Sequence, residues 1–310
     1  MDFPISGTHL QPLYLIGTGL VVGLLGGFFG VGGSFLAGPA LFAMRLPMNF
    51  VVGTDLAHIV GKSIVAFRKH QKLGHVDLKL GLLMVGGTVA GVEVGAQAVQ
   101  YLKRHAHANQ VLAVTFIAVL LGVSAFIGWE SWQSLKRNGK KMSRKTQNGG
   151  QGGAASKGDF SVMAPVARRL QRIQIPPMVS LPHSGIRRVS LWIILGVGFT
   201  GGVFSGFLGG GAGYFRMPAL VYLLGIPTHL AVGTDLFEVV ISAGYGTVSH
   251  ALKGNVDILI ALVMHTGAAI GAQIGSLMTQ YFQGPRIRLA FIPLPLAGAA
   301  LMIYTLASGR

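Results

Sequence analysis

Cysteine is absent from the 310 residues, and charged residues are scarce. Without a thiol, the chain can form no disulfide, no thiolate metal site and no cysteine nucleophile. Only 11% of the residues are charged, whereas a soluble domain has about a quarter. The composition therefore argues against a soluble domain.

The start, MDFPISGTHLQP, lacks the basic region of a secretory signal peptide, so we expect no cleaved leader.

Apolar residues and glycine are abundant instead. The chain is 51% hydrophobic with 47 glycines, and its mean hydropathy is +0.59. Apolar runs near the length of about 20 residues that a membrane helix needs recur along the chain. We predict an all-α polytopic membrane protein of ten hydrophobic segments, two of them short. The segments are 13–29, 34–44 (short), 50–67, 78–101, 110–129, 189–208, 214–224 (short), 230–250, 256–282 and 289–306.

The chain contains an internal duplication. GLLGGFFGVGGSFLAGPAL begins at Gly23, and GVFSGFLGGGAGYFRMPAL begins at Gly202. VGTDL follows a proline turn at 52–56 and again at 232–236, and GAQ recurs at 95–97 and 271–273. Two hydrophobic, glycine-interrupted halves are typical of transporters whose substrate binds between the repeats.

A basic segment separates the halves. Residues 133–188 hold 12 of the 25 Lys and Arg residues and one acidic residue, Asp159. We predict a first transmembrane repeat over 1–132, a basic cytoplasmic linker over 133–188 and a second repeat over 189–310, in a multi-pass protein of the cell (inner) membrane. Five crossings per half make the repeats inverted, and four make them parallel. The charge of the loops favours inverted repeats.

The glycine clusters interrupt a helix in each half. Gly32, Gly33 and Ser34 in the first half correspond to Gly211, Ala212 and Gly213 in the second. A glycine turn that leads into a helix exposes N–H groups at the positive end of the helix dipole, which suits an anion. Close packing of helices is the alternative reason for glycine. The repetition favours an anion site.

Ionisable residues lie within the apolar segments, where charge is costly and is usually functional. Asp55, His58 and Lys62 share one helix face, and Asp235 and Glu238 occupy the matching positions of the second half. We predict that the carboxylates and His58 bind a coupling ion and that Lys62 binds substrate. A structural ion pair is the alternative for His58, Lys62 and Glu238.

Two threonines precede the duplicated aspartates. Thr54 and Thr234 are predicted to bind substrate. The alternative is that these threonines, or Asp55 and Asp235, cap the start of a helix.

Further polar residues complete the candidate set. Arg216, which replaces Ala37 of the first half, presents a planar fork suited to oxyanions. Gln97 and Gln273 recur in both halves and could bind substrate, and Glu93 could titrate or pair with Lys62. His70 and His250 recur near helix ends, where we expect solvated side chains.

Other classes of function have little support in the sequence. No His and Glu spacing resembles a zinc site, and Gly61-Lys62-Ser63 lacks the first glycine of a P-loop. No nucleophile elbow is visible, and the basic linker lacks the context of a nucleic-acid site. We expect no enzyme activity, no cofactor, no metal and no nucleic-acid partner.

The early GGxxGVGG before a proline, the repeated VGTDL and the two joined halves resemble the TauE/SafE family of sulfite and organosulfur anion permeases. The resemblance covers about residues 13–132 and 189–306. It implies a secondary transporter for a small anion such as sulfite or an organosulfonate, held between the broken helices. The carboxylates in such a site favour proton coupling. An anion channel and a permease for a non-sulfur anion are the alternatives, and a homodimer is compatible with both.

Overall fold

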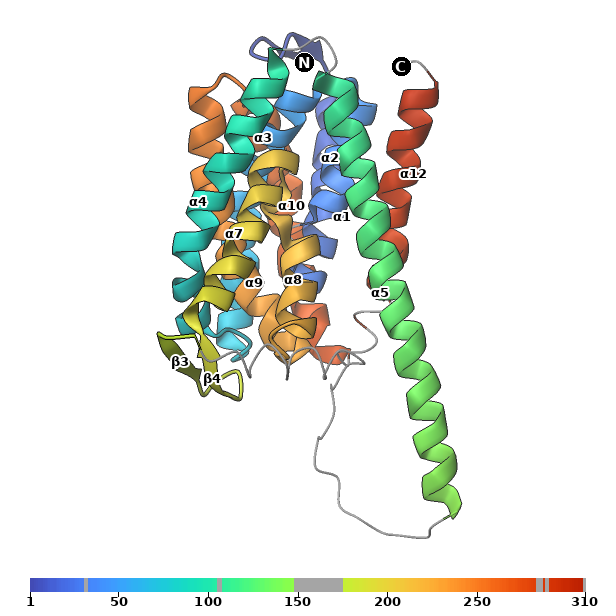
Figure 1. The fold of residues 1–310 in the computed structure, drawn as a ribbon. Coiled ribbons are helices and arrows are strands. Elements are labelled where there is room, and N and C mark those ends of the chain that lie inside the picture. The colour runs from blue at the N-terminus through green and yellow to red at the C-terminus, as the bar shows by residue number, and fades with distance from the viewer. Residues whose placement is uncertain (31–32, 105–107, 148–174, 283–286, 288–289, 309–310) are drawn as a thin grey trace.

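A computed structural model describes residues 1–30, 33–104, 108–147, 175–282, 287 and 290–308. The helices stand side by side in one bundle, and α5 extends beyond one end of it (Figure 1). The helices are α1 (Pro12–Phe29), α2 (Ser34–Ala43), α3 (Met48–Lys72), α4 (Leu78–Lys103), α5 (Ala108–Gln147), α7 (Leu191–Leu208), η1 (Gly210–Ala212), α8 (Gly213–Tyr222), α9 (Thr228–Leu252), α10 (Ile258–Met278), η2 (Thr279–Tyr281) and α12 (Pro293–Ala307).

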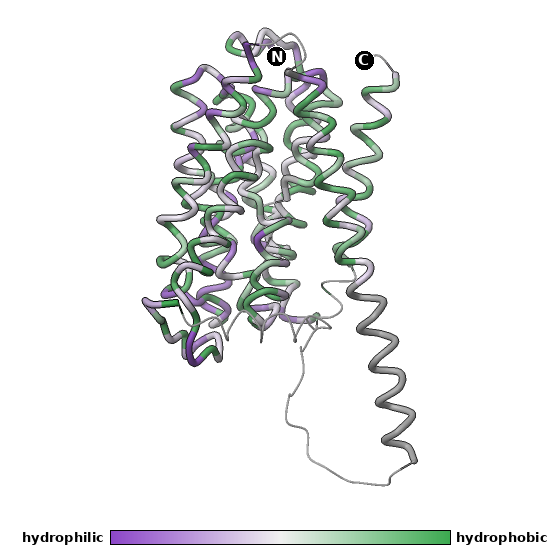
Figure 2. Tube along the Cα trace, viewed as in Figure 1, coloured by the Kyte–Doolittle hydropathy of each residue, from purple (hydrophilic) through white to green (hydrophobic). Residues whose placement is uncertain are grey.

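Each of the ten predicted segments overlaps one of these helices, and that all ten are membrane segments stays a prediction. In the described part of the chain, six helices are long and apolar enough to cross a membrane: α1, α3, α4, residues 109–129 of α5, α7 and α10. Hydrophobic residues run along the height of the bundle, and hydrophilic residues gather at its two ends and at a few points inside (Figure 2). The chain is therefore a multi-pass membrane protein, as its composition predicts.

Two antiparallel β-hairpins depart from the all-α prediction. The strands β1 (Asp2–Phe3) and β2 (Thr8–His9) precede α1, and the strands β3 (Met178–Leu181) and β4 (Ile186–Ser190) precede α7. Strands this short carry almost no pattern of alternation, so the sequence gives little sign of them. The predicted linker over 133–188 holds the last part of α5 and most of β3–β4, and its residues 148–174 lie outside the described part.

Helices of the two halves pair with each other. The helix α1 packs along α10, and α4 packs along α7. Glycines four residues apart line both seams: a Cβ on Gly19, Gly23 or Gly27 would meet the backbone of α10, and one on Gly198, Gly202 or Gly206 would meet that of α4. Small residues let backbones approach this closely, as in other membrane helix pairs.

The helices α3 and α9 pack against each other between these two seams. The helix breaks lie against them: a Cβ on Gly30 would touch Val232 of α9, and a Cβ on Gly209 would touch Val52 of α3. Glycine is required at both breaks, since Gly30 has φ +73° and Gly209 has φ +83°. The two halves therefore meet at the positions where their helices are interrupted.

Equivalent helices run in opposite directions. The helix α1 starts at the end of the bundle that carries the N-terminus, whereas α7 starts at the opposite end, beside β3 and β4 (Figure 1). After the break, the short helix α2 returns toward the end from which α1 came, so α1 and α2 form a hairpin (Figure 1). If α1 and α2 count as a hairpin, each half has four crossings, for which parallel repeats are expected, but α1 and α7 run in opposite directions (Figure 1).

The β-hairpins hold the turns of the opposite half. The Ser6 hydroxyl donates a hydrogen bond to Oδ2 of Asp257 (2.7 Å), in the turn before α10. The Ser184 hydroxyl donates to Oδ2 of Asp77, in the turn before α4. Each aspartate also caps the helix that follows, since its Oδ1 accepts a backbone N–H from the first turn. Each hairpin therefore fixes the start of one helix in a seam.

Candidate functional site

The α3 cluster consists of Asp55, His58 and Lys62, which all face the interior of the bundle. Their side chains are buried, and Lys62 is only 2% exposed. Nδ1 of His58 lies 3.0 Å from Oδ1 of Asp55. It also lies 3.1 Å from the backbone carbonyl oxygen of Asp55, and this oxygen accepts its hydrogen bond. The spacing of three and seven residues accounts for the shared face. The geometry is compatible with the alternative of a structural ion pair for His58, because its ring lies beside the Asp55 carboxylate.

The α9 cluster consists of Asp235 and Glu238 of α9, with Arg216 of α8 and Thr88 of α4. NH1 of Arg216 donates to Oδ1 of Asp235 at 3.2 Å, and both side chains are fully buried. The Thr88 hydroxyl donates to Oε2 of Glu238 at 2.6 Å. Three helices, α4 of the first half and α8 and α9 of the second, thus supply this buried polar cluster.

Several buried polar atoms in the two clusters have no hydrogen-bond partner among the described residues. Leaving such groups unpaired costs about 1–3 kcal/mol each, and more for a charged group. The donors are Lys62 Nζ, Tyr214 Oη and Arg216 Nε and Nη2, and the acceptors are Asp55 Oδ1 and Oδ2, Asp235 Oδ2 and Glu238 Oε1. The two clusters therefore offer both unpaired donors and unpaired acceptors.

Tyr214 is a further buried polar residue of α8. It is the second residue of the helix and is fully buried. Its hydroxyl group has no hydrogen-bond partner among the described residues. Arg216, which pairs with Asp235, follows it by two residues on the same helix. No pattern in the sequence points to Tyr214 or Thr88, because the first half has Phe35 at the position of Tyr214 and neither residue belongs to a repeated polar motif.

The second helix break opens beside these clusters. Gly209, Gly210, Gly211 and Ala212 all have positive φ values, and α8 begins directly after them at Gly213. The side chain of Ala212 is fully buried, and a Cβ on Gly211 would touch Val239 of α9. Four successive residues in the left-handed region are costly for anything but glycine. The break therefore ends at a helix start that is buried in the protein.

The first break is described only at its edges. Gly33 has φ +75°, and a Cβ there would meet the backbone of Val22. The helix α2 then starts at Ser34. Gly32 lies outside the described residues, and the structure does not place the side chain of Ser34. The predicted anion-binding role of both breaks stays a prediction.

The alternative of helix capping is wrong for Thr54, Asp55, Thr234 and Asp235. The helices α3 and α9 begin at Met48 and Thr228, so these residues lie more than one turn inside. The Thr54 hydroxyl accepts the backbone N–H of Asp257 (3.0 Å), and the Thr234 hydroxyl accepts that of Asp77 (2.9 Å). Each threonine therefore joins its own half to the turn of the other half. Its predicted contact with substrate remains untested.

Glu93 does not pair with Lys62. Its carboxylate lies 3.1 Å from Nζ of Lys253 and accepts hydrogen bonds from Ser249 and Tyr245 of α9, at the edge of the α4–α9 contact. Gln97 is exposed and donates to Glu93. Gln273 is also exposed. The structure thus keeps Glu93, Gln97 and Gln273 apart from the buried clusters.

The expectation of solvated histidines at 70 and 250 is wrong. Both side chains are fully buried. Nε2 of His70 donates to the carbonyl oxygen of Gly27 (3.1 Å), and Nε2 of His250 donates to that of Gly206 (2.8 Å). They bind the ends of α1 and α7. Their repetition at an offset of 180 residues was the available signal.

Among the described residues, no group of three or more His, Asp or Glu side chains could hold a metal ion. The candidate site is therefore built from charged and hydroxyl groups of four helices.

A family model described as "Sulfite exporter TauE/SafE" matches residues 15–302. This match spans both halves, both helix breaks and both clusters.

The chain also resembles curated proteins over most of its length. It is 26% identical to the probable membrane transporter protein YunE of Bacillus subtilis, over 87% of this chain and 89% of the relative. It is 21% identical to YdhB of the same organism, over 92% and 97%. A probable membrane transporter protein of Xylella fastidiosa is 36% identical over 33% of this chain and 40% of its own length. No solved structure matches the chain.

Proposed function

The chain belongs to the sulfite exporter TauE/SafE family, and from this premise we propose that it is a secondary transporter for a small anion bound at the α3 and α9 clusters. The transported anion is a sulfur oxyanion or an organosulfonate, and its movement is coupled to protons. The chain then works by transport rather than by catalysis.

The observation that carries the proposal is the set of unpaired donors. Lys62 and Arg216 bring two cations into a membrane interior, and each has at least one N–H group without a partner in the described part of the chain. Charged groups at this depth face the bundle interior or a water-filled path and mark substrate pathways. An oxyanion supplies the acceptor oxygens that these groups lack. The Tyr214 hydroxyl, which also lacks a partner among the described residues, offers a further donor.

The helix breaks support the same site. The N-termini of α2 and α8 face inward after the breaks, and the positive ends of their dipoles favour a bound anion. Residues 32–34 and 211–213 would contribute backbone N–H groups, and Thr54 and Thr234 lie one residue from the clusters. Broken helices that meet at a repeat interface are the usual substrate sites of secondary transporters.

The unpaired carboxylate oxygens support proton coupling. Asp55, Asp235 and Glu238 each have a carboxylate oxygen without a hydrogen-bond partner among the described residues, and a bound proton would supply the missing donor. A carboxylate without a proton would repel the anion. A proton on a carboxylate removes that repulsion when the anion enters. Glu93 is a weaker candidate, because Lys253, Ser249 and Tyr245 already satisfy it.

We further propose that the two halves, 1–132 and 189–310, are inverted repeats. The opposite directions of α1 and α7 and the paired contacts between halves support this architecture. It would allow one half to move against the other around the central site. The basic segment 133–188 then lies in the cytoplasm, with the N-terminal hairpin on the other side.

The experiment is anion flux into liposomes that contain the purified protein. Labelled sulfite should enter faster when a proton gradient is imposed, and a panel of sulfate, thiosulfate, taurine and acetate defines selectivity. Lys62→Met should abolish the flux, and the control Lys103→Gln, which changes a lysine outside the clusters, should leave it intact.

Two results would contradict the proposal. Flux that neither saturates nor responds to the proton gradient would indicate a channel. Equal flux in Lys62→Met and wild type would show that transport does not use an anion site at Lys62.

A further inference from the structure

Two equivalent helix contacts join the halves of the molecule, and one of them is closed while the other is open. Gly298 of α12 packs on α2, where a Cβ would meet the carbonyl oxygen of Phe35 and lie 3.2 Å from Cγ of Pro39. The counterpart of Gly298 at the offset of 176 residues is Gly122 of α5, where an added Cβ would have no atom of the described residues within 4 Å. The helix α5 therefore stands away from α8 where α12 touches α2.

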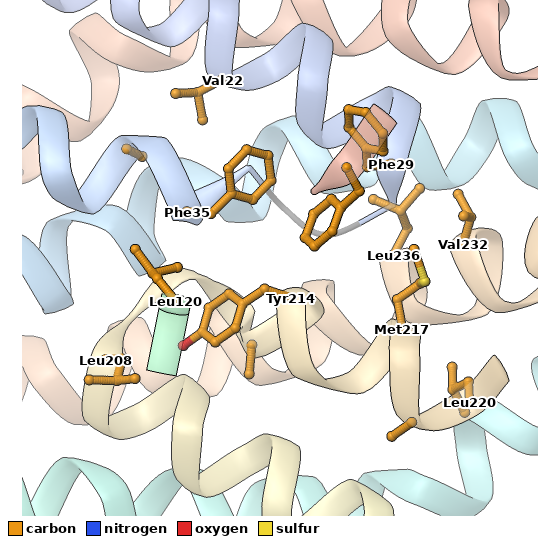
Figure 3. Packing of buried hydrophobic residues seen from close by; sticks show 14 of the residues in the cluster. Val22, Phe29, Phe35, Leu120, Leu208, Tyr214, Met217, Leu220, Val232 and Leu236 are labelled. Atoms are coloured by element: carbon orange, nitrogen blue, oxygen red, sulfur yellow. The ribbon is translucent and has the colours of Figure 1, made fainter. Parts of the chain in front are cut away.

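The open contact leaves an apolar groove. It has a free volume of about 270 Å³ and is lined by Gly122, Val123, Phe126, Tyr214, Phe215, Pro218, Ala219, Tyr222 and Leu223. We call it the α5–α8 groove. Figure 3 shows the Tyr214 ring reaching from α8 toward a piece of α5, beside Leu120 and Leu208. Ligand sites have about 300–1,000 Å³, so the groove admits one slender occupant.

The groove opens onto the surface that faces the membrane. Gly122 and Phe126 are exposed on α5, within the apolar span 109–129. The lining carries no charged side chain, and Tyr214 and Tyr222 supply its only hydroxyl groups. A small anion would find no cation there. An acyl chain matches the lining and is the molecule that the surrounding bilayer supplies.

The sequence beyond this span indicates which lipid. The helix α5 continues past Trp129 to Gln147, and residues 130–147 include six Lys or Arg residues and one acidic residue. A helix rises about 1.5 Å per residue, so the first of these basic residues, Lys136, follows Phe126 by about 15 Å along the axis. Basic clusters directly beyond a membrane helix attract anionic headgroups.

We propose that the α5–α8 groove is a binding site for one acyl chain of an anionic phospholipid from the leaflet at the Trp129 end of α5. The lipid separates α5 from α8 in place of the direct contact that α12 makes with α2. The proposal does not depend on the transported substrate.

The test uses phosphatidylglycerol with a photoreactive diazirine in its acyl chain, added to the full-length protein in nanodiscs. Peptide mapping should place the label on residues 122–126 and 215–223. Gly122→Leu fills the groove and should reduce this labelling about tenfold, which corresponds to about 1.4 kcal/mol. Ala219→Leu fills it from the opposite wall and should act alike, which keeps the test valid if one variant does not fold.

The matched control is Gly196→Leu, which adds the same side chain to an exposed glycine of α7 with nothing within 4 Å. Its labelling should equal that of wild type. Labelled phosphatidylcholine should give less signal than phosphatidylglycerol, and glutamine at 136, 137, 140 and 141 should remove the difference.

Three outcomes would overturn the proposal. Equal labelling of wild type and both groove-filling variants would indicate annular lipid only. Equal labelling by the two lipids would exclude recognition of the anionic headgroup. A crosslinked dimer that Gly122→Leu abolishes would show that a second copy covers the groove.

Discussion

The first and second halves of the chain make the same packing contacts but place different charges between them. In both halves a serine of a β-hairpin binds an aspartate of the opposite half, a threonine accepts that aspartate's N–H, and a histidine binds a glycine carbonyl. The glycines of the two helix seams are also matched. These contacts therefore recur in a symmetric pattern between the two halves.

The charged residues break this symmetry. Lys62 matches Ser242, His58 matches Glu238, and Arg216 matches Ala37. The first half thus carries a lysine that has no hydrogen-bond partner among the residues the structure describes, and the second half carries an arginine that is paired with Asp235. Packing constrains both halves alike, whereas recognition of a single substrate between them needs only one set of charges.

The turns at the two ends of α3 and α9 differ in the same way. Near one end, Nδ2 of Asn49 donates to Oδ1 of Asn255, which also accepts from Lys103. The matching residues near the other end are His229 and His75, whose rings lie 5.0 Å apart. One end therefore carries an amide pair that cannot titrate, and the other carries two imidazoles.

The largest expected effect is a difference in stability between variants of the two buried cations, Arg216 and Lys62. Arg216→Met leaves Asp235 buried and unpaired and should reduce the free energy of unfolding by about 3–5 kcal/mol. Lys62→Met removes a cation that makes no hydrogen bond, so the loss should stay below about 1 kcal/mol. Thermal unfolding in detergent measures both.

The double variant Arg216→Met, Asp235→Leu is the control. It should recover most of the lost stability, because no charge is left unpaired, yet it should lose stabilisation by the anion. A single Arg216→Met variant as stable as wild type would show that the Arg216–Asp235 pair contributes nothing.

The second prediction tests the symmetry of the seams. Gly23→Ala in α1 and Gly202→Ala in α7 each place a Cβ against the neighbouring backbone, at Ala268 and Thr88. Overpacking costs about 1–3 kcal/mol, and the two losses should be similar. Gly17→Ala and Gly196→Ala, at matching positions with open space, are the controls and should show no loss of melting temperature. Unequal losses would mean that one seam is looser.

The third prediction concerns the hairpin contacts. Ser6→Ala and Ser184→Ala each remove one hydrogen bond to an aspartate, so each should reduce the free energy of unfolding by about 1 kcal/mol. Threonine at either position keeps the hydroxyl and should retain most of the stability. Hydrogen exchange should rise in the turn that holds Asp257 for Ser6→Ala and in the turn that holds Asp77 for Ser184→Ala. A rise in hydrogen exchange that is confined to the hairpin, with none in the turn, would show that the serine does not hold the turn.

The smallest effect comes from the imidazole pair. Burial, with the nearby His229, lowers the pKa of His75 from its ordinary value of 6.5. The folded state then binds fewer protons than the unfolded state, so stability from this group is present above pH 6.5 and is lost as the pH falls through the lowered pKa. His75→Asn, which copies residue 255, should make the melting temperature fall less between pH 7 and pH 5. An unchanged pH dependence would exclude His75.

Much of the fold was predictable because membrane helices carry a strong local signal. The predicted runs 13–29 and 78–101 agree with α1 and α4 to within two residues at each end. The agreement is close because about 20 consecutive apolar residues leave few alternatives to a helix in a membrane. The hairpins at Ser6 and Ser184 were missed. Their only sign is the repeated PISG and PHSG, too short a pattern to distinguish from chance.

The candidate site was predictable only in part. Asp55, His58 and Lys62 were placed on one face by their spacing alone, and the structure confirms that the three side chains are buried together. Glu93 looked equally buried in the sequence, but it lies at the edge of α4 beside Lys253. Which side of a mostly apolar helix faces the protein depends on its neighbours, and no single segment contains that information.

The sequence by itself determined the membrane setting, the helices, the duplication and the positions of the charges, because these follow from local composition and spacing. Only the tertiary structure decided the pairing of Arg216 with Asp235, the isolation of the Lys62 amine and the difference between the closed α2–α12 contact and the open α5–α8 groove. Such contacts join residues that are distant along the chain. Their geometry is set by how whole helices pack, which no local pattern records.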